Sequence, residues 1–206
     1  IKIGRFGSIN TGMNQGVAGN RFLGFSLNGS GDRTTRYVNA NINQNGQFEE
    51  LSSTRFLPQD AALRQSSENR ARSNQGYIGY GINYDAGERL NISYDGRING
   101  SLRNSDALSN SRIERLSDGF DFSRNENTIN NESDAIGIQQ DLGFYLKLDS
   151  LGSEWDTKFG YSFSDNHSEQ NYFNVFLLPV NNQINGEGGT DQQRHFFQFQ
   201  SDLTYR

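Results

Sequence analysis

The sequence predicts an all-β chain of about eight antiparallel strands, and three observations predict it. Apolar side chains recur at every second residue in eight separate stretches, which is the period of a strand with two different faces. Gly, at 23 residues, and Asn are spread along the whole chain, and both disfavour helices. The stretches are joined by connections that alternate between short and long. We therefore expect a sheet without helices.

The alternation is clearest between Leu90 and Tyr94. Leu90, Ile92 and Tyr94 share one parity, whereas Asn91 and Ser93 share the other. The same pattern, weakest in the first stretch, predicts strands at 1–12, 20–31, 33–45, 73–84, 89–102, 133–148, 154–166 and 193–206. Each strand has roughly ten residues or a little more, which is the length that crosses a bilayer when the strand is tilted.

The composition explains why one face of each strand is polar. Apolar residues make up only 33% of the chain and the mean hydropathy is -0.80, which is low for a soluble core. Aromatic residues still reach 12%, which a disordered chain would lack. A membrane barrel accounts for both values, because its strands are apolar only on the outside and its loops need no apolar residues.

Several kinds of chemistry are disfavoured by the composition. The absence of Cys excludes a disulfide scaffold, a thiol nucleophile and any Cys-based metal site. With two His, a zinc site built on histidines is nearly excluded. The net charge of -5 argues against a nucleic-acid partner. No nucleophile–base pair stands out, so we expect neither an enzyme nor a cofactor.

The connection lengths predict which ends of the strands lie together. Short connections fall at 31–33, 85–88 and 149–153, and long ones at 46–72, 103–132 and 167–192, with the modest link 13–19 counted among the long ones. Short periplasmic turns and long extracellular loops are typical of outer-membrane barrels. The predicted fold is therefore an antiparallel transmembrane β-barrel segment of about eight strands with short periplasmic turns and long extracellular loops. One rim should hold Asp32, Gly87 and Gly152, and the other Asp60, Gly119 and Gly188.

A family resemblance rests on the residue pattern and the order of these strands. It rests on the runs Phe6–Thr11, Arg21–Tyr37 with the Asn-rich strand ending near Asn45, Tyr77–Tyr84 followed by an acidic turn and Leu90–Tyr94, and Phe197–Tyr205. These runs resemble the barrel of a Bacteroidetes-type TonB-dependent receptor over most of the chain. The resemblance includes no catalytic motif.

The resemblance implies a barrel of about 22 strands with a plugged lumen in the outer membrane of a Gram-negative bacterium. Such receptors import scarce, bulky nutrients such as metal chelates, vitamins, glycans or peptides. The implied partners are outer-membrane lipid, the rest of the barrel and its plug, the TonB energy-coupling complex acting through that plug, and a surface lipoprotein.

Residues 1–206 would then form an internal part of one barrel domain that excludes the plug and the energy-coupling box. Arg206 lies within an alternating run, so we expect the strands at 1–12 and 193–206 to leave open edges rather than pair with each other. The rest of the barrel would satisfy these edges.

Four residues in the predicted loop 167–192 are candidates for substrate or partner contact. Tyr172 and Phe173 lie beyond the expected bilayer, and Leu177 and Leu178 add an apolar patch to the same loop. Exposed apolar patches usually meet another molecule. Aromatic residues near strand ends, among them Tyr84, Tyr94, Trp155 and Phe163, are expected to form an interfacial girdle.

Two groups of polar residues suggest metals only superficially. The run Asp165–Glu169 lacks the regular oxygen spacing and turning Gly of a calcium loop, so we expect a polar strand end. The Gly-rich run Asn185–Asp191 occurs once rather than in a tandem array, so we expect a loop tip. His195 beside two Phe residues is expected at an interface or in the lumen.

A second class of protein fits the same pattern. A non-transporting β-rich surface protein, such as an adhesin or a structural barrel, would show similar strands. A plug and an energy-coupling box encoded upstream of this region would favour the receptor.

Overall fold

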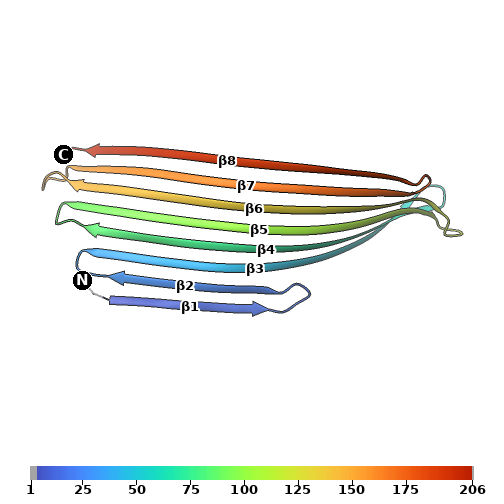
Figure 1. Cartoon of the computed structure of the whole chain (residues 1–206), viewed down its shortest axis with the longest axis horizontal. Coiled ribbons are helices and arrows are strands. Elements are labelled where there is room, and N and C mark those ends of the chain that lie inside the picture. Colours follow the sequence, from blue (N-terminus) through green and yellow to red (C-terminus); the bar gives the residue numbers. More distant parts are fainter. Residues whose placement is uncertain (1–3, 206) are drawn as a thin grey trace.

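The computed structural model describes residues 4–205, which form one antiparallel sheet with its strands in chain order (Figure 1). The strands are β1 (Gly4–Asn14), β2 (Asn20–Ser30), β3 (Thr34–Leu57), β4 (Ala61–Asp85), β5 (Leu90–Arg115), β6 (Asp121–Lys147), β7 (Glu154–Leu178) and β8 (Asn182–Thr204). The predicted all-β fold with eight antiparallel strands is confirmed. The predicted first and last strands also included residues 1–3 and 206, which lie outside the described residues.

The six strands β3 to β8 are far longer than predicted. Each has 23 to 27 residues. The prediction of long loops at 46–72, 103–132 and 167–192 is wrong, because these regions continue the strands and turn only at residues 58–60, 116–120 and 179–181. Their side chains are largely polar on both faces, so the regular alternation that identifies a strand in sequence is lost, whereas backbone pairing with a neighbouring strand does not depend on it.

The turns fall on two opposite rims of the sheet (Figure 1). Asp32, Gly87 and Gly152 lie on the rim that also carries both ends of the chain, and Asp60 and Gly119 lie on the other, as predicted. Gly188 does not lie at a turn, because it lies within β8, where it pairs with Gln170 of β7. Gly87 and Gly119 have φ angles of 97° and 72°, a conformation that favours glycine.

Asp149 organises the turn between β6 and β7. Its carboxylate accepts backbone N–H groups from Leu151, Gly152 and Ser153 at 2.8, 3.0 and 2.9 Å. Hydrogen bonds from Ser153, through its side chain and its backbone, are the main cause that lowers the pKa of Asp149. The turn is therefore held by an ionised side chain.

The sheet is open. β1 pairs with β2 and β8 pairs with β7, and β1 and β8 lie at opposite edges of the sheet (Figure 1). The predicted absence of pairing between the first and last strands is thus confirmed for the described residues. Because the β1–β2 hairpin is short, β2 pairs with β3 only as far as Gln44, and the rest of β3 forms a further free edge.

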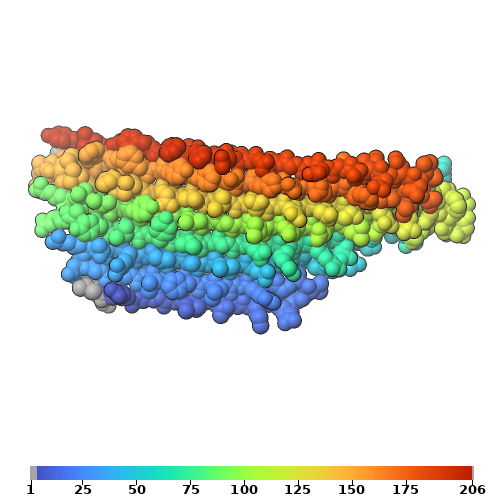
Figure 2. Space-filling model, in the orientation of Figure 1, coloured from blue at the N-terminus to red at the C-terminus, as the bar shows by residue number. Residues whose placement is uncertain are grey.

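Residues 4–205 form a single-layer sheet, because all eight strands belong to one sheet and none forms a second layer. Figure 2 shows one face of this sheet, over which no further element lies. In that part of the chain only Ala61 and Ala62 are buried hydrophobic residues. Cross-strand backbone hydrogen bonds and side-chain pairs therefore hold the sheet together, rather than a packed core.

Candidate functional site

One face of the sheet is apolar in the half next to the short turns. Directly paired residues share a face, so the strand register shows which side chains lie together. One row crosses all eight strands and is apolar up to its last member: Ile9, Phe25, Ala40, Ile78, Ile98, Ile138, Phe163 and His195. This row and the apolar residues of the same face around it, from the short-turn rim to the level of Ile42 and Ile136, are called the apolar band.

The opposite face is polar at the same level. The adjacent row consists of Ser8, Ser26, Asn39, Gly79, Arg97, Gln139, Ser162 and Phe196. Only its last member, on the edge strand β8, is apolar. The parity predicted from sequence therefore holds across all eight strands at this level of the sheet.

The apolar band is uncovered. Large side chains on it remain widely exposed, for example Phe197 at 75% and Leu203 at 69%. A soluble sandwich would cover such a face with a second sheet, and residues 4–205 supply none. Exposed apolar surface of this extent indicates a surface that meets lipid or another protein.

Aromatic side chains cover glycines on the neighbouring strand. Phe22 lies over Gly12, Tyr37 over Gly81, Tyr80 over Gly96 and Tyr172 over Gly186, each in direct register. A side chain at any of these glycines would collide with the ring. Such pairs strengthen a twisted sheet by covering backbone that glycine leaves bare.

On the polar face, Gly81 lets one side chain cross a whole strand. Tyr37 of β3 passes over Gly81 of β4, and its hydroxyl donates to Asp95 Oδ1 of β5 at 2.6 Å. On the apolar face, Tyr80 passes over Gly96 and contacts Gln140 of β6 at 3.2 Å. Each bridge ties together three strands.

The aromatic residues predicted to form a girdle all lie on the face of the apolar band. Tyr84 and Trp155 sit near the short-turn rim, Tyr94 lies closer to the middle of the band, and Phe163 lies near its other end. Along the edge, Phe159 contacts Phe199 with ring centroids 4.9 Å apart, and Phe163 contacts His195 at the same distance. His195 therefore belongs to an aromatic cluster.

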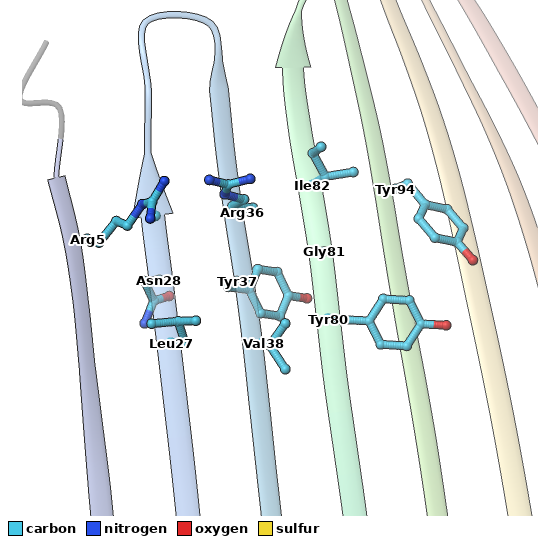
Figure 3. Close-up of a pocket in the computed structure, with 11 residues that line it drawn as sticks. Arg5, Leu27, Asn28, Arg36, Tyr37, Val38, Tyr80, Gly81, Ile82 and Tyr94 are labelled. Atoms are coloured by element: carbon cyan, nitrogen blue, oxygen red, sulfur yellow. The ribbon is translucent and has the colours of Figure 1, made fainter.

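A shallow hollow of about 350 Å³ opens on the apolar face near the short-turn rim (Figure 3). Leu27, Val38, Tyr80 and Ile82 line it, with the backbone of Gly81 as part of its floor. Arg5 and Arg36 line its rim side. The hollow thus combines apolar walls with two cationic groups.

The four predicted contact residues lie in strand β7 rather than in a loop. Tyr172 pairs with Gly186 and Phe173 with Asn185, so their side chains point to opposite faces. Leu177 and Leu178 end the strand, and Leu178 pairs with Arg124. The structure therefore does not bring the four side chains into one patch, and their contact with a substrate or partner stays a prediction.

His167 lies in β7, beyond the apolar band. Its Nδ1 contacts Asp191 Oδ1, and its Nε2 lies 3.3 Å from Glu169 Oε1. The hydrogen bond to Asp191, followed by the charges of Asp191 and Glu169, raises the pKa of His167. Within residues 4–205, no group of three or more His, Asp or Glu side chains is placed to hold a metal ion.

Sequence reasoning missed an arginine row outside the apolar band. Arg64, Arg112 and Arg124 are direct neighbours on three adjacent strands. Glu114, which is 7% exposed, binds both Arg64 and Arg112, the latter at 3.2 Å. The glutamate offsets the repulsion between the cations. No local motif indicates this cluster, because its members come from regions that were predicted to be loops.

No model of a known family and no curated protein matches the sequence of the chain. None of the described residues forms a helix long and apolar enough to span a membrane.

Proposed function

We propose that the chain forms part of the wall of an outer-membrane barrel of the TonB-dependent receptor type, which imports a scarce and bulky nutrient into a Gram-negative cell. The observation that carries the proposal is the uncovered apolar band, which the strand register makes continuous across one face of a single-layer sheet. In a membrane barrel this face meets lipid and the polar face meets the lumen.

The dimensions of the band support this arrangement. It covers about ten residues of each strand, and ten residues that rise about 3.3 Å each at a tilt near 40° cross roughly 25 Å. That height matches the apolar belt of outer-membrane barrels. The free edges of β1 and β8 support a wall that continues on both sides.

The sheet beyond the apolar band supports a second candidate, a non-transporting surface protein such as an adhesin. There β3 to β8 continue as paired strands with largely polar side chains on both faces. Such hairpins would project from the membrane and present a broad polar surface to other molecules. The receptor and the adhesin share the lipid-facing band and differ in whether nutrient crosses the barrel.

Transport is tested by deleting the gene and measuring uptake of metal chelates, vitamins, glycans and peptides with an intact or a deleted TonB system. The receptor predicts that uptake of one nutrient class is lost in either deletion. Unchanged uptake of every class, together with altered adhesion of the cells, would favour the surface protein.

Orientation is tested by labelling intact cells at single cysteines, which the chain lacks naturally. Glu88 directly follows Gly87, and Ser117 lies two residues before Gly119; both are exposed turn residues, and they avoid the positive φ angles of those glycines. We expect an impermeant reagent to label Ser117→Cys and not Glu88→Cys. Labelling at Glu88→Cys alone would reverse the orientation.

A further inference from the structure

Two arginines and a glycine form a row at the short-turn rim of the apolar face. Arg5 of β1, Gly29 of β2 and Arg36 of β3 are directly paired. Because strands lie about 4.8 Å apart, the two arginines start roughly 10 Å from each other. Both side chains lean over the glycine, since a Cβ atom at Gly29 would lie 3.3 Å from Arg36 Nε and 3.9 Å from Arg5 Cγ.

The view of this region shows Arg5 extending from β1 across β2 toward Arg36, beside the apolar side chains of Leu27 and Val38 (Figure 3). Neither guanidinium group has an ion-pair partner within residues 4–205, whereas Arg64, Arg70, Arg112, Arg115 and Arg124 all have one. Two cations are thus left without counter-charge at the border of an apolar surface.

We propose that this row binds the headgroup phosphate of an anionic phospholipid, with Arg5 and Arg36 holding the phosphate over Gly29 and an acyl chain lying in the adjacent hollow. The inference rests on the proposed function, in which this face meets lipid. Guanidinium groups bind phosphate oxygens through paired, charge-assisted hydrogen bonds. Basic pockets at the edge of an apolar surface bind lipid headgroups in the same way.

The shape of the site favours a lipid over other occupants. Directly beside the arginine pair, the hollow offers Leu27, Val38, Tyr80 and Ile82, which suit hydrocarbon rather than a soluble anion. A further strand that paired with β1 would extend the sheet in its own plane, so it would leave the face over Gly29 uncovered. The absence of a side chain at Gly29 lets both arginine side chains approach each other over β2, so that one phosphate can bind both guanidinium groups.

The test measures binding of the 206-residue chain to vesicles by flotation. The vesicles consist of phosphatidylcholine alone or of phosphatidylcholine with phosphatidylglycerol. The variants are Arg5→Gln/Arg36→Gln and a control of equal charge change, Arg55→Gln/Arg103→Gln. Arg55 and Arg103 are exposed, lie beyond the apolar band and make no ion pair within residues 4–205.

We expect the wild-type chain and the control to bind vesicles with phosphatidylglycerol more tightly. Arg5→Gln/Arg36→Gln should lose that preference by roughly fivefold for each arginine. An equal loss in both double variants would overturn the site, because general charge attraction would then suffice. Loss of the preference on adding free inorganic phosphate at the same concentration as the phosphatidylglycerol would also overturn it, in favour of a soluble anion.

The two proposals fail in different ways. If the wild-type chain binds neither kind of vesicle, the lipid-facing role itself is wrong. If it binds both kinds equally, the lipid-facing role stands and only the headgroup site is wrong.

Discussion

The two halves of the sheet share the same strands but present different side chains to their surroundings. Next to the short turns, one face is apolar and the other polar; beyond the level of Ile42 and Ile136, both faces are largely polar although the same strands continue. The first half depends on its surroundings to cover the apolar band. The second half, called the polar half below, needs only water on either side.

The difference shows what a single-layer sheet reveals about its environment. Backbone pairing is continuous through both halves, so pairing itself does not distinguish them. The side chains do, because an apolar face without a second layer indicates a surface that is covered by lipid or by another protein. In the polar half, ion pairs such as Arg112 with Glu114 take the place of apolar contacts. Under the proposed function, the boundary between the halves would lie at the edge of the membrane.

The largest effect is expected from a charge placed on the apolar band. Leu142→Arg should destabilise the chain folded in lipid by about 2–4 kcal/mol, because Leu142 pairs with Tyr94 near the middle of the band and its replacement moves a guanidinium into hydrocarbon. Leu108→Arg, on the neighbouring strand and the same face but in the polar half, should change stability by less than about 0.5 kcal/mol. Ser93→Arg, on the polar face, should also cost little. Denaturant titration of the three variants in lipid vesicles checks the comparison, and equal losses for Leu142→Arg and Leu108→Arg would contradict it.

A smaller effect is expected at a strand-crossing bridge. Gly81→Ala would drive a methyl group into the Tyr37 ring and the Asp95 carboxylate, and so break their hydrogen bond. We expect a loss of about 1–3 kcal/mol in unfolding free energy. Gly76→Ala, in the same strand, meets no atom within 4 Å and serves as the control. Equal stability of the two variants in denaturant titrations would show that the bridge contributes nothing.

The polar half should respond to pH through His167. Its raised pKa means that protonation stabilises the pairing of β7 with β8. This contribution is complete below the ordinary histidine pKa and is lost as pH rises through the raised value. Hydrogen exchange of the β7–β8 amides, corrected for intrinsic exchange rates, should show this loss of protection. His167→Gln should abolish the pH step, and His195→Gln should retain it; a step that survives in His167→Gln would exclude His167 as its source.

The smallest effect is expected from enlarging a side chain on the apolar band. Ile92→Trp should be nearly neutral against fluid lipid, because no fixed neighbour stands above the sheet. In a packed sandwich the same change overfills the core and typically costs about 1–3 kcal/mol. Denaturant titration in vesicles distinguishes the two, and a cost within that range would indicate a packed partner layer.

The half that carries the apolar band could be predicted from sequence, and the polar half could not. Alternation between Leu90 and Tyr94 identifies a strand because its two faces meet different media. Between Arg64 and Arg72 both faces meet water, so no period remains to be detected. These residues are strands because a neighbouring strand is present, which is information that lies elsewhere in the chain.

The bridge on the polar face was hidden for the same reason. Tyr37 and Asp95 are separated by 58 positions, and their contact depends on the register between β3 and β4. That register is set by the turn at residues 58–60, which the sequence pattern places inside a long loop. The row of Arg5 and Arg36 depends instead on the two links at 15–19 and 31–33. The predicted connections at 13–19 and 31–33 match these links closely, whereas the predicted loop 46–72 is far longer than the turn at 58–60.

The central claim is that the apolar band meets lipid, and tryptophan fluorescence tests it most directly. Trp155 is the only tryptophan of the chain, so Trp155→Phe provides a background in which Ile92→Trp and Ser93→Trp report the two faces separately. In vesicles with brominated acyl chains, we predict strong quenching at Ile92→Trp and little at Ser93→Trp, with the reverse order for aqueous acrylamide. Equal quenching of both positions by the brominated lipid, or none at Ile92→Trp, would contradict the account.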